Sequence, residues 1–180
     1  MALTRLGLNQ SINLATNVTG TLATGNGGTG ATSFTSGKLL QIVELTHTSN
    51  DYTTATGFST LFQQAITPSA TSSKVLVIAT LQYNLYGNGG SSFPSGSVQL
   101  LDNDDNTLAK SFATASGNVS TDQTDQWGST LSMSVLDSPS TTSSHTYKIS
   151  YKAGGSGRFG ILGSSNQDKG TRLTLIEIGA

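Results

Sequence analysis

The chain has 180 residues, a formal net charge of −1 and no cysteine. This length allows one domain with an additional arm, and the missing cysteines exclude disulfides and thiolate metal sites. We expect no nucleic-acid partner and no membrane insertion, because the chain has no basic excess and no apolar run near the roughly 20 residues that span a bilayer. Charged residues make up only 11%, against about a quarter in an average domain. Ser, Thr, Gly and Asn replace them, which favours β structure with many turns.

The first 19 residues form a polar segment with apolar residues at alternate positions. The apolar residues are Leu6, Leu8, Ile12, Leu14 and Val18. A period of two predicts an extended segment with one apolar face. A single strand cannot bury that face by itself, so we expect the arm to lie against copies of itself or against another protein. The alternative is a disordered leader, and the sequence leaves it open.

Residues 20–37 are uncharged and rich in Gly and Thr. They contain too few apolar side chains to form a core, so they are interpreted as a linker. The motifs at 19–22 and 25–33 resemble a linker that recurs in bacteriophage tail fibres and related virion fibre proteins. In that family the linker joins a virion-proximal anchor to a distal head. The resemblance implies that arm 1–19 binds a capsid or tail protein, and that the protein is made in the host cytoplasm and ends at the virion surface.

From residue 38 onward the sequence predicts about nine short strands separated by Gly, Asn, Asp, Ser or Pro. They are 39–45, 58–66, 74–86, 97–101, 107–112, 131–135, 147–151, 158–162 and 172–178. No helical stripe interrupts them, so we expect an all-β antiparallel sandwich over residues 38–180. Leu76 and Ile78 lie between the alternating apolar residues of the third strand. They predict that the first half of this strand is covered on both faces.

Three motifs of this region carry a second resemblance. Residues 65–77, 136–149 and 172–178 are similar to the opening, a turn with its strand, and the final strand of a jelly-roll head in many phage and marine viral fibre genes. Such heads are similar to tumour-necrosis-factor and C1q heads and are usually trimeric. The resemblance implies a homotrimer of an extended arm followed by a jelly-roll β-sandwich.

Metal binding is the first chemistry that the residues suggest. Asp102, Asp104 and Asn106 match the first ligand positions of a calcium loop. Thr107 stands where that loop needs glycine, and Ala113 stands where it needs a bidentate glutamate. We therefore interpret 102–106 as the polar tip of a hairpin, and we expect no metal and no cofactor.

The histidines and several aspartates are candidates for catalysis. His47 and His145 are the only histidines, and we expect both at the surface rather than in a triad. Binding of a metal by three symmetry copies of one histidine on a trimer axis stays open. Asp122, Asp125 and Asp137 are candidate acids for glycoside hydrolysis, but they lie in polar loops or turns. We therefore expect that the protein is not an enzyme.

Binding a host ligand requires fewer specialised residues than catalysis does. An aromatic face with neighbouring amides, hydroxyls and carboxylates suffices for a sugar, and loops on a rigid scaffold commonly carry such sites. The candidates are Tyr86, Phe93, Asn118, Asp122, Asp125, Gln126 and Trp127, in or beside loops 87–95 and 118–127. The alternative for Trp127 is a place in the core or in a subunit contact.

Two classes of function remain. In the first, the head is an adhesin that binds a host-surface glycan or protein. In the second, the protein is a structural head fibre or accessory tail protein that assembles with or stabilises the particle.

Overall fold

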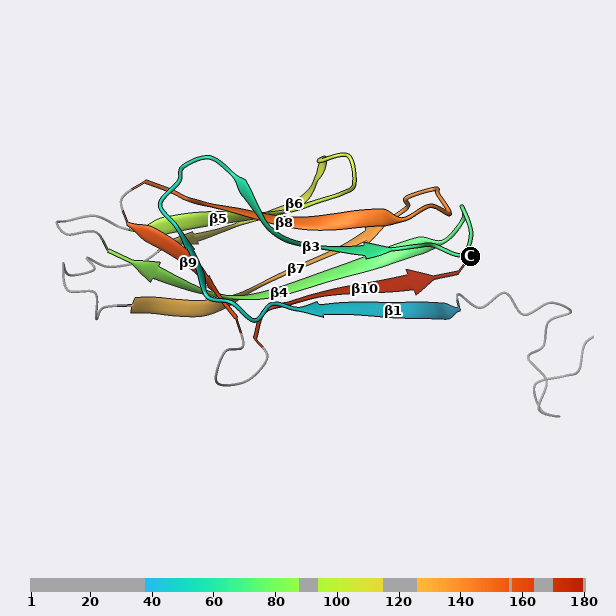
Figure 1. Ribbon diagram of the computed structural model, residues 1–180, viewed down its shortest axis with the longest axis horizontal. Coiled ribbons are helices and arrows are strands. Elements are labelled where there is room, and N and C mark those ends of the chain that lie inside the picture. The colour runs from blue at the N-terminus through green and yellow to red at the C-terminus, as the bar shows by residue number, and fades with distance from the viewer. Residues whose placement is uncertain (1–37, 88–93, 115–125, 156, 164–169, 180) are drawn as a thin grey trace, which may run out of the picture. The chain divides into compact units, whose positions relative to one another are not determined.

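The computed structural model describes residues 38–87, 94–114, 126–155, 157–163 and 170–179. These residues form ten strands and no helix (Figure 1). The strands are β1 (Leu39–Thr46), β2 (Asp51–Thr53), β3 (Ser59–Ile66), β4 (Lys74–Tyr86), β5 (Ser95–Leu101), β6 (Thr107–Thr114), β7 (Gln126–Asp137), β8 (His145–Ala153), β9 (Arg158–Leu162) and β10 (Arg172–Ile178). Within this part of the chain, no segment has the length and apolar character of a membrane-spanning helix.

The strands form two antiparallel sheets that pack face to face (Figure 1). Sheet A contains β1-β10-β4-β7 in that order, with β9 and β2 extending it beside the second half of β4. Sheet B has the order β3-β8-β5-β6. Without β2 and β9, the eight remaining strands have the order of a double-sheet jelly roll. The predicted all-β antiparallel sandwich is confirmed.

Strand β4 shows why these residues form this fold. Its inward residues Val75, Val77, Ala79 and Leu81 are each 0% exposed. They pack in one core with residues of sheet B, such as Tyr147 and Ile149. Burying a side chain of this size stabilises the fold by roughly 1.5–3 kcal/mol, so the period of two in the sequence decides which face of the strand turns inward.

The outer face of sheet A differs from the prediction. Leu76 and Ile78 were expected under a second layer, but they are only half-buried. In the described chain, sheet B packs against the inner face of β4 and no second layer lies on its outer face, so its outer residues are covered only by neighbours in their own sheet.

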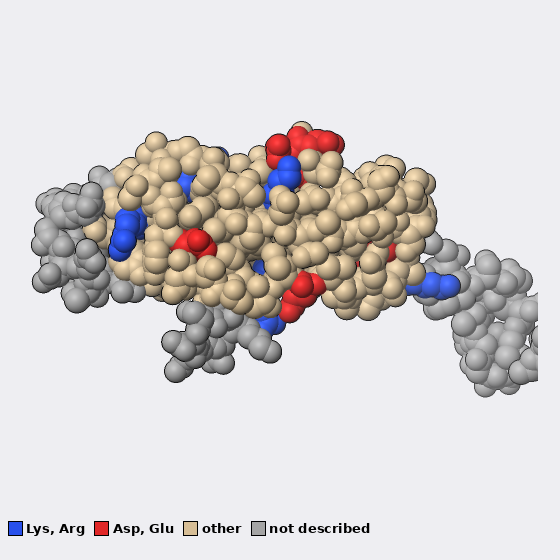
Figure 2. All heavy atoms as spheres, viewed as in Figure 1, with Lys and Arg blue, Asp and Glu red and all other residues tan. Residues whose placement is uncertain are grey.

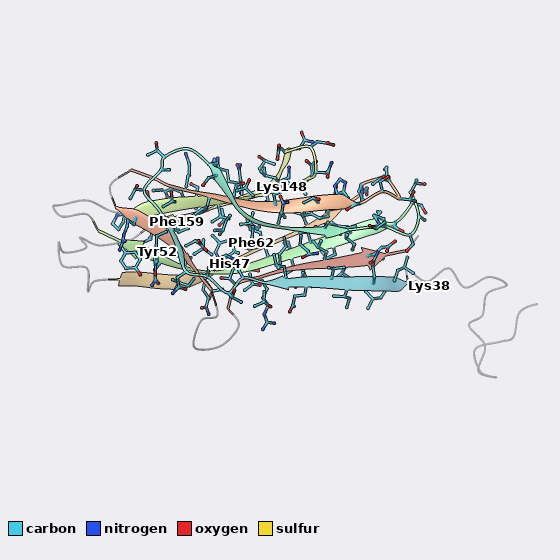
Figure 3. The ribbon with its side chains drawn as sticks, in the orientation of Figure 1. Lys38, His47, Tyr52, Phe62, Lys148 and Phe159 are labelled. Carbon is cyan, nitrogen blue, oxygen red and sulfur yellow. The ribbon has the colours of Figure 1, made fainter. Side chains whose placement is uncertain are left out.

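Strand β4 divides this outer face into two halves. Its first half pairs with β10 and its second half with β9, while β7 runs along its whole other edge. We call the part formed with β1 and β10 the proximal half, because it lies at the end where Lys38 enters. The part formed with β2 and β9 is the distal half. Figure 3 shows Lys38 at one end of the head and Tyr52 and Phe159 towards the other.

Most strand bounds agree with the prediction to within a few residues. Strand β2 was not predicted, because three residues are too few to show a period. Strand β7 begins earlier than expected, at Gln126. The head belongs to one compact unit, Gly37–Ala180. The arm with Leu6, Leu8, Ile12, Leu14 and Val18, and the linker, lie outside the described residues, so their roles stay predictions.

Candidate functional site

The distal half of sheet A carries a row of residues in register across four strands. Tyr52 of β2 pairs with Gly160 of β9, which pairs with Asn84 of β4, which pairs with Gly128 of β7. Across the sheet, a residue with a side chain therefore alternates with a glycine. This alternation is the basis of the candidate site.

The two glycines make room for the side chains beside them. A Cβ atom at Gly160 would overlap the Tyr52 ring, and one at Gly128 would overlap the Asn84 side-chain oxygen. The Tyr52 ring therefore lies across the backbone of β9, and the Asn84 amide leans over β7. A glycine inside a strand commonly marks such a close approach.

An aromatic and cationic cluster borders this row. The Tyr86 and Tyr52 hydroxyls share a hydrogen bond of 3.2 Å, and the two rings meet edge to face at 5.3 Å. The Arg158 guanidinium lies 4.9 Å from the Tyr86 ring centre and 5.3 Å from that of Tyr52. These are distances of cation–π contact. The hydrogen bond with Tyr86, followed by burial, raises the pKa of Tyr52 to about 12, so its phenol stays neutral at physiological pH.

A shallow pocket of about 260 Å³ lies on the other side of the row. Its lining is formed by Gln82, Tyr83, Asn84, Gly128, Ser129, Thr130 and Leu162. The polar groups of this lining are amides and hydroxyls, and none carries a formal charge at neutral pH. Such groups both donate and accept hydrogen bonds, which suits a ligand with hydroxyl groups.

The structure describes only some of the site residues that the sequence predicted. Tyr86 belongs to the aromatic cluster and is 7% exposed. Gln126 and Trp127 lie in the backbone of β7, opposite Tyr86 and Leu85. Phe93, Asn118, Asp122 and Asp125 lie outside the described residues, so their predicted roles stay untested.

Sequence reasoning missed Tyr52, Gln82, Asn84 and Arg158. The alternation of β4 held a signal, because Gln82, Asn84 and Tyr86 share the face opposite its core residues. Tyr52 and Arg158 gave no comparable signal, since only the pairing of β2 and β9 with β4 brings them to this face.

The acidic hairpin between β5 and β6 is closed by its own hydrogen bonds. Asp102 Oδ1 accepts hydrogen bonds from the backbone amides of Asp104, at 2.9 Å, and Asn106, at 2.8 Å. The Asn106 side-chain amide donates to Asp102 Oδ2 at 2.9 Å. These bonds occupy the carboxylate that a metal would need, and the turn stands out as an acidic cluster in Figure 2. No group of three or more potential metal ligands occurs among the residues that the structure describes.

Both histidines contradict the prediction of a surface position. The side chain of His47 is 12% exposed; it stacks on Phe62 at 4.9 Å and its Nε2 is 2.7 Å from an Asp51 carboxylate oxygen. His145 is 9% exposed, and its Nε2 lies 3.8 Å from an oxygen of Asp137. His145, the first residue of β8, is buried, and His47, the residue after β1, is largely covered, because both lie on the inward face of the sandwich. Their polar neighbours in sequence do not reveal this.

No known family model and no curated protein matches the chain. The solved structures similar to it include VP2 of infectious bursal disease virus as a subviral particle, with 11% identity over 77% of this chain and a TM-score of 0.34. A chain of T=1 particles derived from infectious bursal virus is 11% identical over 98% of this chain, with a TM-score of 0.33. The chain spans about 40% of the length of each of these two matched chains. The jelly-roll assignment given above follows from the strand order of this chain itself.

Proposed function

We propose that this chain is a homotrimeric virion-surface fibre protein whose head binds a host-surface glycan through the distal half of sheet A. The observation that carries the ligand site is the row of Tyr52, Gly160, Asn84 and Gly128, with the pocket beside it. The resemblance of the Gly/Thr-rich linker and of the head motifs supports the fibre architecture and the trimer.

The chemistry of this face suits a sugar. Tyr52 is 38% exposed, so its ring is available to pack against the C–H groups of a sugar. Gln82 and Asn84 offer amides to the sugar hydroxyls, and the neutral lining does not repel an uncharged ligand. Since this lining contains neither a carboxylate nor a histidine, we propose binding without covalent chemistry.

A shallow site of this kind binds weakly. We expect a dissociation constant around millimolar, or about 4 kcal/mol of binding free energy, for one head and one sugar. Several copies on one fibre and many fibres on one particle raise the avidity without any new contact.

The test compares single variants of the head in binding to host cells. Tyr52→Ala and Asn84→Ala should each weaken binding about tenfold, or about 1.4 kcal/mol. Gln63→Ala is the matched control, because Gln63 is exposed on β3 of the opposite sheet. All three variants should first show cooperative thermal unfolding. If Tyr52→Ala and Asn84→Ala bind as well as the control does, the site is wrong.

A second candidate function is structural, as a head fibre or an accessory tail protein that stabilises the particle. The observation that favours it is the set of exposed aliphatic residues on the proximal half, including Ile42 and Leu136. If the unmodified head binds no host cell, this function replaces the adhesin.

Both candidates share the anchoring role of the arm. Deleting residues 1–19 should leave a folded head that no longer joins the particle, since the linker separates the two parts. A truncated protein that still assembles into virions would contradict the anchoring role.

A further inference from the structure

The proximal half of sheet A carries an apolar row in register across four strands. Ile42 of β1 pairs with Ile176 of β10, which pairs with Leu76 of β4, which pairs with Leu136 of β7. Ile42 is 57% exposed and Leu136 is 52% exposed, while Ile176 and Leu76 are half-buried. A sheet face that meets water normally carries polar residues, so this row departs from the usual pattern.

The row belongs to a larger surface, which we call the proximal apolar patch. Its members are Leu39, Leu40, Ile42, Leu76, Ile78, Leu136, Ile176 and Ile178. Leu39 and Leu40 are 60% and 42% exposed. Together with Ile42 and Leu136 they expose on the order of 400 Å², which matches the largest apolar patch of a typical monomer and is commonly functional. The distal half of the same face is polar, so the patch has a defined boundary.

Two opposite charges, those of Arg172 and Glu44, lie beside the row and neutralise each other. Arg172 Nη1 lies 3.9 Å from a carboxylate oxygen of Glu44, and the Thr174 hydroxyl donates to that oxygen at 3.3 Å. A partner that covers the patch therefore meets a pair of opposite charges at this border. At the opposite border the exposed Lys74 of β4 pairs with the patch member Ile178, so a contact between copies has to leave this cation at its solvent-exposed rim.

We infer that copies of this chain associate with one another through the proximal apolar patch. The inference deepens the proposed homotrimer, on which it rests, by naming the face that forms the contact. In an assembly of three copies the four most exposed residues would contribute on the order of 1,200 Å² in total, at the lower end of the roughly 1,200–2,000 Å² that a standard interface buries. Closed homo-oligomers are the common assembly of soluble proteins. The distal ligand face stays outside the contact.

The first test measures the mass of the full chain by sedimentation velocity at micromolar concentration. The unmodified chain should sediment as a multiple of its 18.5 kDa mass. The double variant Ile42→Ser with Leu136→Ser should weaken association at least tenfold and shift the protein towards the monomer. Phe112→Ser is the matched control, because Phe112 is 63% exposed on β6 of the opposite sheet. The control should keep the mass of the unmodified chain.

The second test uses the absence of natural cysteines. Ile42→Cys and Phe112→Cys each introduce one thiol at an exposed position, so the core is unchanged. A short bismaleimide should join two chains through Ile42→Cys and should not do so through Phe112→Cys. This readout does not depend on whether the double serine variant remains folded.

Four results would overturn the inference. One is an oligomer whose mass the double variant leaves unchanged, because another surface then forms the contact. Another is failure of Ile42→Cys to cross-link between chains. A third is a monomer with Ile42→Cys protected from maleimide, because the chain's own residues 1–37 then cover the patch. The fourth is a monomer that is labelled freely, which leaves the patch to a different protein. Binding to host cells tests the distal ligand site separately, so the two proposals fail independently.

Discussion

Glu177 is a carboxylate that ties three parts of the head together. It is 0% exposed, and its oxygens accept hydrogen bonds from the Gln41 side chain at 2.6 Å and from the amide and hydroxyl of Ser69 at 2.6 and 3.1 Å. Gln41 also donates to the backbone carbonyl of Thr67 at 2.7 Å. Strand β1, strand β10 and the turn after β3 therefore depend on one side chain.

The change Glu177→Gln keeps the shape of this side chain and removes its charge. A hydrogen bond to a charged group is worth about 1.5–3 kcal/mol, and an amide presents one acceptor where the carboxylate presents two. We expect the free energy of unfolding to fall by about 2–3 kcal/mol at pH 7. For a domain of this size that loss corresponds to roughly 4–12 °C in Tm.

The pH dependence has a definite sign. Burial by itself would raise the pKa of Glu177, but the side chains of Ser73 and Gln41 and the amide and hydroxyl of Ser69 outweigh it and lower the pKa below its usual 4.5. The buried Ser73 hydroxyl has no partner within hydrogen-bond geometry, so the bonds from Gln41 and Ser69 are the ones that hold the carboxylate. Because the folded pKa is the lower one, the stabilisation is complete above the unfolded pKa and is lost as the pH falls through the folded pKa.

The assay is urea unfolding of both proteins at pH 7 and again about one pH unit below the ordinary glutamate pKa. The protein concentration is held constant, because association shifts apparent stability. The difference between the two proteins should be largest at pH 7 and smaller in acid. Glu44→Gln is the control, because the Glu44 carboxylate is exposed on β1; it should change stability by less than about 0.5 kcal/mol. The reasoning is refuted if Glu177→Gln matches this control, or if its effect is the same at both pH values.

Two further predictions concern the distal site. Gly160→Ala should displace the Tyr52 ring and destabilise the head by about 1–3 kcal/mol in urea unfolding, whereas Gly57→Ala, with no atom within 4 Å of the added methyl, should have little effect; equal stability of the two variants would contradict the close approach. Ultraviolet titration of the tyrosines should show Tyr52 ionising near pH 12. Tyr86→Phe removes the main cause and should bring this pKa down towards 10. Because the folded pKa of Tyr52 is the raised one, its contribution to stability is complete below pH 10 and lost between pH 10 and 12. A Tyr52 that ionises near pH 10 in the unmodified head would show that the phenol pair does not form.

The class of the fold and the inward face of the main strands were predictable from the order of the residues. The bounds of β4, β9 and β10 follow from the alternation of their side chains. This alternation is readable because the direction of a strand side chain depends only on its position in the local backbone. The hairpin tip at 102–106 was predictable for the same reason, since Asp and Asn close turns with hydrogen bonds to nearby residues.

The surfaces that these strands create depend on how the strands pair and pack. The row from Tyr52 to Gly128 and the row from Ile42 to Leu136 each depend on the register between strands that lie far apart in the chain. Side-chain burial at His47 and His145 likewise depends on which strand of the other sheet lies opposite. A local pattern gives the face of one strand, but pairing and packing are cooperative properties of the whole sandwich, so the candidate site became visible only when four strands met.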